Sequence, residues 1–150
     1  MQTEQRFGLF GAVKFGLFGG IAAVLVSLIG MVDAFEKNDI ITDILTMSQV
    51  ILMAFAFGAA YFAASQAQRT NRGIAIPGAM LAGAMTGLLI GLLALAIVPL
   101  QMRSVFVNAT PQLAAELMPG ETSGVIGALL LVVLGAGVGL VAALISYIPT

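Results

Sequence analysis

The sequence predicts an all-α fold, an integral membrane bundle of four transmembrane helices with a short amphipathic surface helix between the third and fourth. Four stretches carry no charged residue, and each is close to or longer than the roughly 20 apolar residues that span a bilayer core. They cover residues 15–32, 44–65, 74–100 and 125–148. Only 9% of the residues are charged and 60% are hydrophobic, whereas soluble domains carry about 25% charged residues. The spans and their connections use nearly all of the chain, which predicts a single transmembrane domain over residues 1–150.

The composition argues against several classes of function. The net charge of −1 gives no basis for a nucleic-acid partner. Histidine and cysteine are absent, which removes the commonest metal and haem ligands and the commonest general base. The four charge-free stretches also hold no ionisable group for a proton relay or an ion site. We therefore predict no catalytic residue, no metal site and no cofactor, and the chain is not expected to be an enzyme.

The N-terminal segment contains a short repeat rich in phenylalanine. Phe-Gly-Leu-Phe-Gly occurs twice, and the eight-residue offset between the copies is a little over two helical turns. Phe7 and Phe10 are expected at the headgroups, whereas Phe15 and Phe18 enter the membrane. The repeat is interpreted as an interfacial anchor that leads into the first span. A docking strip for a partner or for a long lipid-like cofactor is the alternative.

The second span is the most aromatic of the four. Phe55 and Phe62 are seven residues apart on one helical face, while Phe57 and Tyr61 lie on another. Aromatic side chains on both faces suit contact with lipid, carotenoid or pigment, and packing within the bundle explains them equally well. Phe55, Tyr61 and Phe62 are therefore candidate contacts for lipid or for a partner.

Small residues form ridges in the last two spans. Gly83, Gly87 and Gly91 recur every four residues in the third span, and Gly135 and Gly139 do so in the fourth. No hydrophobic force drives helices together in lipid, so close packing through small residues does much of that work. These glycines are predicted to be helix-packing positions, either among the helices of this chain or against another subunit.

The connection between the third and fourth spans is predicted to contain the short amphipathic helix. Thr110 suits the N-cap of that helix, and Pro111 suits its first position. Leu113, Leu117 and Met118 then share one face. We expect this helix to lie on the membrane surface, with its apolar face turned inward.

Lysine and arginine predict the orientation. Arg6, Lys14, Arg69 and Arg72 fall on one side of the predicted bundle. Cytoplasmic segments of membrane proteins carry an excess of these residues, so both termini are expected in the cytoplasm. The acidic connection 33–43, which matches no calcium-loop pattern, is expected to be a solvated loop on the outside.

One region resembles a known family. Residues 100–111 read Leu-Gln-Met-Arg-Ser-Val-Phe-Val-Asn-Ala-Thr-Pro, and the amphipathic helix and a glycine- and leucine-rich span follow. This arrangement resembles the N-terminal membrane region of bacterial branched-chain amino-acid-type ABC transporter permeases, over most of the chain. The resemblance implies a multi-pass protein of the bacterial cytoplasmic (inner) membrane that works with other membrane subunits, a cytoplasmic ATPase and an external binding protein. It assigns no substrate-binding residue.

Such permeases dock on their ATPase through a cytoplasmic loop, and the eight residues 66–73 are too few for that element. The chain is therefore expected to be a non-catalytic subunit that needs partner chains as well as the lipid bilayer. The alternative is an accessory or scaffolding bundle of a larger photosynthetic or respiratory complex. In that role it would pack lipid, carotenoid or quinone without ligating pigment.

Overall fold

The computed structural model describes residues 2–30, 39–41, 45–70, 72–118 and 124–148. In chain order its elements are α1 (Gln2–Leu28), β1 (Asp39–Ile41), β2 (Leu45–Thr46), α3 (Met47–Thr70), η1 (Arg72–Ile74), α4 (Ala75–Ile97), η2 (Met102–Ser104), α5 (Pro111–Leu117) and α6 (Gly124–Ser146). Within the described residues, four helices are long and apolar enough to cross a membrane. This confirms the predicted all-α bundle of four membrane-spanning helices.

The helix ends differ from the predicted spans mainly near the N-terminus. α1 begins at Gln2 rather than near residue 15, because hydropathy marks the part of a helix inside the bilayer and not its whole length. It ends at Leu28, and Gly30 follows in the left-handed region at φ +88°. Glycine adopts this conformation without a steric penalty and commonly ends helices.

The described part of the predicted acidic loop contains a strand. β1 pairs antiparallel with β2, so that Asp39 lies opposite Thr46 and Ile41 opposite Leu45. α3 follows β2 directly and begins at Met47 rather than at residue 44. The remaining residues of the predicted loop lie outside the described residues.

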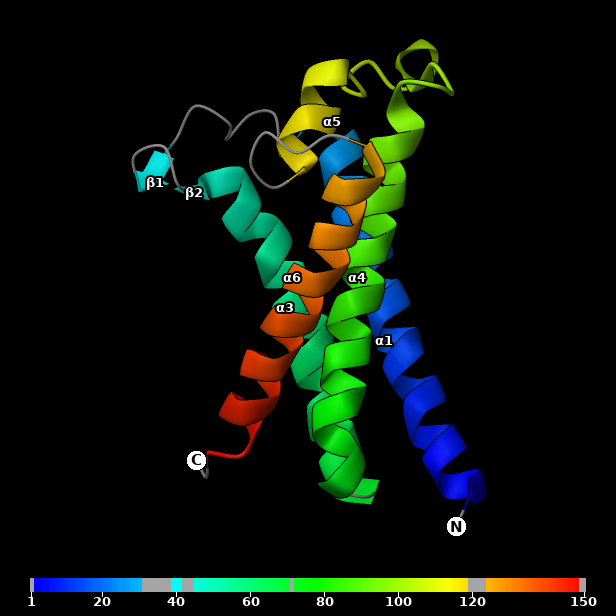
Figure 1. The fold of residues 1–150 in the computed structure, drawn as a ribbon, viewed down its shortest axis with the longest axis vertical. Coiled ribbons are helices and arrows are strands. Elements are labelled where there is room, and N and C mark those ends of the chain that lie inside the picture. The colour runs from blue at the N-terminus through cyan, green and yellow to red at the C-terminus, as the bar shows by residue number, and fades with distance from the viewer. Residues whose placement is uncertain (1, 31–38, 42–44, 71, 119–123, 149–150) are drawn as a thin grey trace.

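The four long helices alternate in direction along the bundle (Figure 1). Both termini lie at one end, here called the terminal end, while β1, β2 and α5 lie at the other, called the α5 end. α1 and α4 run from the terminal end to the α5 end, and α3 and α6 run back. The α3–α4 connection, with Arg69 and Arg72, therefore lies at the same end as both termini. Which of the two ends faces the cytoplasm stays a prediction.

α4 is the central helix of the bundle. It packs most extensively on α6 and also contacts α1 and α3. Half of its spanning window is buried, compared with 22% for the windows of α1 and α6. A smaller share of α1 and α6 than of α4 is therefore buried within the chain.

α5 covers the α5 end of the bundle. The Thr110 hydroxyl accepts a hydrogen bond from the Leu113 backbone N–H at 3.2 Å, which confirms the predicted N-cap. The predicted apolar face packs onto the bundle itself. Leu113 is fully buried and Leu117 is 2% exposed, in one cluster with Leu52 of α3 and Ile97 of α4. α5 is therefore held by the core beneath it as well as by its amphipathic character.

Side-chain hydrogen bonds tie the helices together near both ends. At the α5 end the Asn108 amide donates to the Ile29 carbonyl at 3.0 Å, next to Gly30, and so satisfies a backbone acceptor at the end of α1. At the terminal end the Tyr147 hydroxyl donates to the Arg72 carbonyl at 2.9 Å. This second contact joins the end of α6 to the α3–α4 connection.

Candidate functional site

The predicted glycine ridges of α4 and α6 meet face to face. A Cβ added to Gly83 would collide with the carbonyl oxygen of Gly135 and lie 2.9 Å from its carbonyl carbon. The reverse also holds, because a Cβ on Gly135 would collide with the Gly83 carbonyl oxygen. Gly139 faces the backbone of Ala79, and Gly87 faces the backbone of Leu131. Backbone therefore meets backbone along this contact, which requires a glycine on at least one side of each close approach.

The register of this contact is antiparallel and nearly regular. Four residues further along α4, toward the α5 end, the facing position in α6 lies about four residues nearer to the N-terminus of α6. At Gly91 the fit is looser, because a Cβ there would lie 3.1 Å from the Cα and Cβ of Ala128. The glycine hydrogens that take the place of Cβ point at carbonyl oxygens, the geometry of Cα–H···O contacts between helices. All five glycines singled out in the sequence thus lie in one helix–helix contact.

Glycines of α1 make a second set of close contacts that sequence reasoning missed. A Cβ on Gly16 would lie 2.6 Å from the Ala82 carbonyl oxygen, and a Cβ on Gly19 would lie 2.6 Å from the Cβ of Ala59. Both glycines belong to the second Phe-Gly-Leu-Phe-Gly copy. The repeat was interpreted through its phenylalanines, whereas its glycines make the contacts with α3 and α4. Their three-residue spacing is compatible with a helix contact but does not by itself indicate one.

Two polar side chains are fully buried among the described residues, and both bond the backbone. Ser27 donates to the Ala23 carbonyl at 2.8 Å, within α1. Thr86 lies 3.1 Å from the carbonyl oxygens of both Gly16 and Ala82, so its hydroxyl joins α4 to α1. Within the described part of the chain, no three histidine, cysteine or acidic side chains come together as a metal site would require.

The phenylalanines of α1 lie in different environments. Phe10 is exposed, and the Lys14 Nζ lies 4.9 Å from its ring centroid. Phe18 is 72% exposed, on the outward side of the helix. Phe15 is half-buried and stacks on Phe62 of α3 with centroids 6.4 Å apart. Phe7 lies in α1, and its side chain is outside the described residues.

The aromatic residues of α3 form a row that begins at α1. From Phe15 the row continues through Phe62, then Tyr61 at 6.2 Å, then Phe57 at a further 6.3 Å. Phe62 and Tyr61 are exposed, so this row faces the surroundings of the bundle. Phe55 points elsewhere and packs against the buried cluster beneath α5. The structure therefore separates Phe55 from the other two candidate contacts on this helix.

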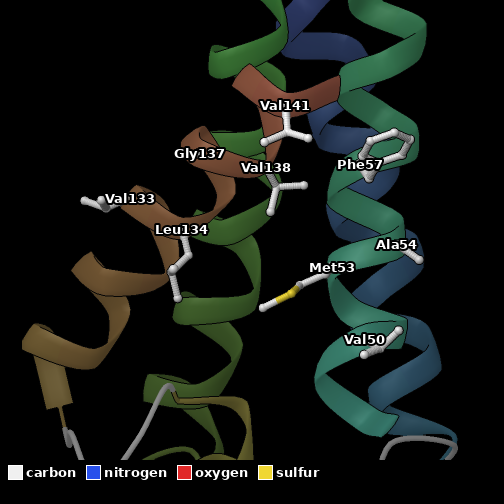
Figure 2. A pocket seen from close by; sticks show the side chains of 9 residues that line it. All are labelled: Val50, Met53, Ala54, Phe57, Val133, Leu134, Gly137, Val138 and Val141. Atoms are coloured by element: carbon white, nitrogen blue, oxygen red, sulfur yellow. The ribbon is translucent and has the colours of Figure 1, made fainter. Parts of the chain in front are cut away.

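An apolar groove lies between α3 and α6, at the far end of this row (Figure 2). It has a volume of about 810 Å³ and is lined by apolar residues alone: Val50, Met53, Ala54, Phe57, Val133, Leu134, Gly137, Val138 and Val141. Phe57 and Val141 lie at one end of it, and Val50 and Leu134 at the other. Nothing in the sequence indicated this groove, since it forms between two helices that are far apart in sequence.

Comparison with protein-family models, with curated proteins and with solved structures finds no match to this chain.

Proposed function

We propose that this chain is a non-catalytic integral membrane subunit that acts together with partner chains. The observation that carries the proposal is the tight packing of the described helices against one another. α4 meets α6 backbone to backbone. Among the residues whose burial is described, the two fully buried polar side chains, Ser27 and Thr86, both bond backbone carbonyls. Along these described helix contacts a solute would find neither space nor a free polar partner. The surfaces that remain for function are therefore the outward faces of the bundle.

The family resemblance supplies one class of partner. It implies further membrane subunits of a branched-chain amino-acid-type ABC permease, with a cytoplasmic ATPase and an external binding protein, in the bacterial inner membrane with both termini in the cytoplasm. In such an assembly the chain would support the permease without forming the route that the solute takes through the membrane. Both termini lie at the same end of the bundle as the α3–α4 connection, which carries Arg69 and Arg72. This arrangement agrees with an orientation in which that end faces the cytoplasm.

The second candidate is an accessory bundle in a larger photosynthetic or respiratory complex. The row of aromatic rings from Phe15 to Phe57 and the apolar groove beside it favour this role. Rings and grooves of this kind suit long apolar molecules such as lipid, carotenoid or quinone tails. No ligand to a pigment metal is needed for such packing.

Purification of the native protein in a mild detergent, with identification of the chains that accompany it, tests the proposal. An ATPase and a binding protein would support the first candidate, and a pigmented or redox-active complex the second. A chain that stays alone after cross-linking in native membranes would refute both. Solute uptake by liposomes that contain only this chain, above the level of empty liposomes, would refute the non-catalytic role.

A further inference from the structure

We propose that the seam between α1 and α3 binds the headgroup of an anionic phospholipid at the terminal end, between the cations of Lys14 and Arg69. The seam is the line of contact along which Phe15 of α1 stacks on Phe62 of α3. The inference goes beyond the proposed function, because it does not depend on which partner chains the protein has. It rests on the depth of Lys14, on the position of Arg69 and on the unbalanced charge of this end.

Lys14 is a charged side chain inside a membrane-spanning segment. The candidate span of α1 covers Leu9–Leu28, so Lys14 lies about 7 Å along the helix axis from its beginning. The other charged residues of the four candidate spans are Arg69 and Arg72, and each lies within one residue of a span end. A charge inside a span is costly in hydrocarbon and commonly marks a functional contact.

The Lys14 side chain turns toward the terminal end. Its Nζ lies 4.9 Å from the ring centroid of Phe10, which is one helical turn nearer to that end. Lysines inside a span reach for the headgroups in this way. The ring covers one side of the ammonium, and no described residue accepts a hydrogen bond from it. An ammonium has three N–H donors, so this one can still bond to an anion.

Arg69 is exposed and lies on the side of α3 that forms the seam. It follows Phe62 by seven residues, or about two helical turns, and so shares the helix face that contacts Phe15. One turn before Arg69 the two helices are still side by side, because a Cβ added to Gly11 of α1 would lie 3.8 Å from the Gln66 Oε1.

The two cations reach a similar depth on opposite sides of the seam. α1 and α3 are antiparallel, so the pairing of Gly11 with Gln66 places Arg69 level with a position three residues before Gly11. The Lys14 ammonium lies beside Phe10. The Arg69 backbone and this ammonium therefore differ in depth by about 3 Å. Both side chains are long and flexible enough to meet a phosphate placed over the seam.

The positive charge of this end is not balanced by the protein. The helices of the bundle, α1, α3, α4 and α6 with η1, contain one acidic residue, Glu4, and four basic ones, Arg6, Lys14, Arg69 and Arg72. Within the described ranges, neither Lys14 nor Arg69 forms an ion pair with another described residue. The chemistry of the seam therefore fits an anion.

The depth of Lys14 selects a lipid as the source of that anion. A soluble acidic protein or a free anion would have to enter the span region to meet this ammonium. The phosphate of a phospholipid already lies at the edge of the hydrocarbon core, and its acyl chains can continue along the exposed ring of Phe62. Phosphatidylglycerol carries a net negative charge, whereas phosphatidylcholine balances its phosphate with a choline cation. Net attraction to the two cations is therefore confined to the anionic lipid.

Quenching of a single tryptophan measures which lipid occupies the seam. The chain has no tryptophan, and Phe62→Trp places an indole in the ring stack beside Phe15. The protein is reconstituted in phosphatidylcholine, and either brominated phosphatidylglycerol or brominated phosphatidylcholine replaces part of that lipid. Half-maximal quenching is expected at a fraction of brominated phosphatidylglycerol about fivefold lower than the fraction of brominated phosphatidylcholine.

Four variants in the Phe62→Trp background locate the site. Lys14→Gln and Arg69→Gln should each remove most of the difference between the two lipids. Lys14→Arg keeps the charge and should keep the difference. Arg72→Gln is the matched control, because it removes the same charge at the same end but on the α6 side, where the Arg72 carbonyl accepts the hydrogen bond of Tyr147. It should leave the difference in place.

Three results would overturn the proposal. Equal quenching curves for the two brominated lipids would leave the cations to another partner, such as an acidic protein segment. An equal loss of the difference in Arg72→Gln would show attraction to the net charge of the protein and not to a site. Loss of the difference on addition of inorganic phosphate at constant ionic strength would assign the seam to a free anion.

Discussion

Replacing Gly87 by leucine should separate α4 from α6. A Cβ at this position would collide with the Leu131 carbonyl oxygen, and it would lie 2.8 Å from the Leu131 carbonyl carbon and 3.2 Å from the Cα of Val132. All three atoms belong to the α6 backbone and cannot move aside as the tip of a side chain could. The clash is therefore relieved only by movement of a whole helix.

The size of that movement follows from the distances. Carbon atoms in contact lie about 3.5–4.0 Å apart, so the two helices must separate by roughly 1 Å before a leucine side chain is accommodated at all. A separation of this size would also loosen the Gly83–Gly135 contact one turn away. Overpacking of fitted contacts costs about 1–3 kcal/mol. For a chain of this length the melting temperature should fall on the order of 5 °C.

The assay is thermal unfolding of the purified chain in detergent, followed by circular dichroism. Gly137→Leu is the matched control, because it makes the same change in the contacting helix at a position with nothing within 4 Å of the added Cβ. Gly91→Ala should fall between the two, since its Cβ would be tight but not in collision. If Gly87→Leu melts at the same temperature as Gly137→Leu, the contact between α4 and α6 does not hold the bundle and the reasoning is wrong.

Three further predictions concern single side chains. Thr86→Val keeps the shape of the side chain but removes its hydrogen bond to α1, so the free energy of unfolding should fall by about 1 kcal/mol. The same change at the exposed Thr70 should have little effect on the free energy of unfolding. Asn108→Ala should leave the Ile29 carbonyl without this partner and speed amide hydrogen exchange at the end of α1, and unchanged exchange there would contradict the assigned contact. Because the chain has no cysteine, single cysteines at Gln68 and Val107 report orientation. An impermeant thiol reagent applied to intact cells should label only the Val107 position, and the reverse pattern would place the termini outside.

The features predicted correctly from the sequence are those that the bilayer itself dictates. A helix that crosses hydrocarbon must be long, apolar and free of charge, so the four spans could be recognised one at a time. The N-cap at Thr110 was equally local, since it depends on a threonine followed by proline. The position of both termini at the same end of the bundle followed from the even number of spans, while the side of the membrane on which that end lies stays a prediction.

The features that the sequence left undetermined depend on which helices are neighbours. The spacing of Gly83 and Gly87 indicates a close contact but not that its partner is α6. The glycines of α1 could not be distinguished from those of a lipid-facing anchor, because their contacts lie in helices that come much later in the chain. The groove at Gly137 was hidden for the same reason, since an open glycine and a packed one look alike in sequence.

The central position of α4 has a consequence for how this sequence can change over evolutionary time. Substitutions that exchange one bulky apolar residue for another should accumulate freely on the outward faces of α1 and α6, where most positions meet only their surroundings. α4 has little such freedom, because its small residues fit against helices on three sides. Divergent versions of this chain should therefore keep the glycine and alanine spacing of α4 long after the rest of the sequence has ceased to be recognisable. A search guided by that spacing would reach further than one guided by overall similarity.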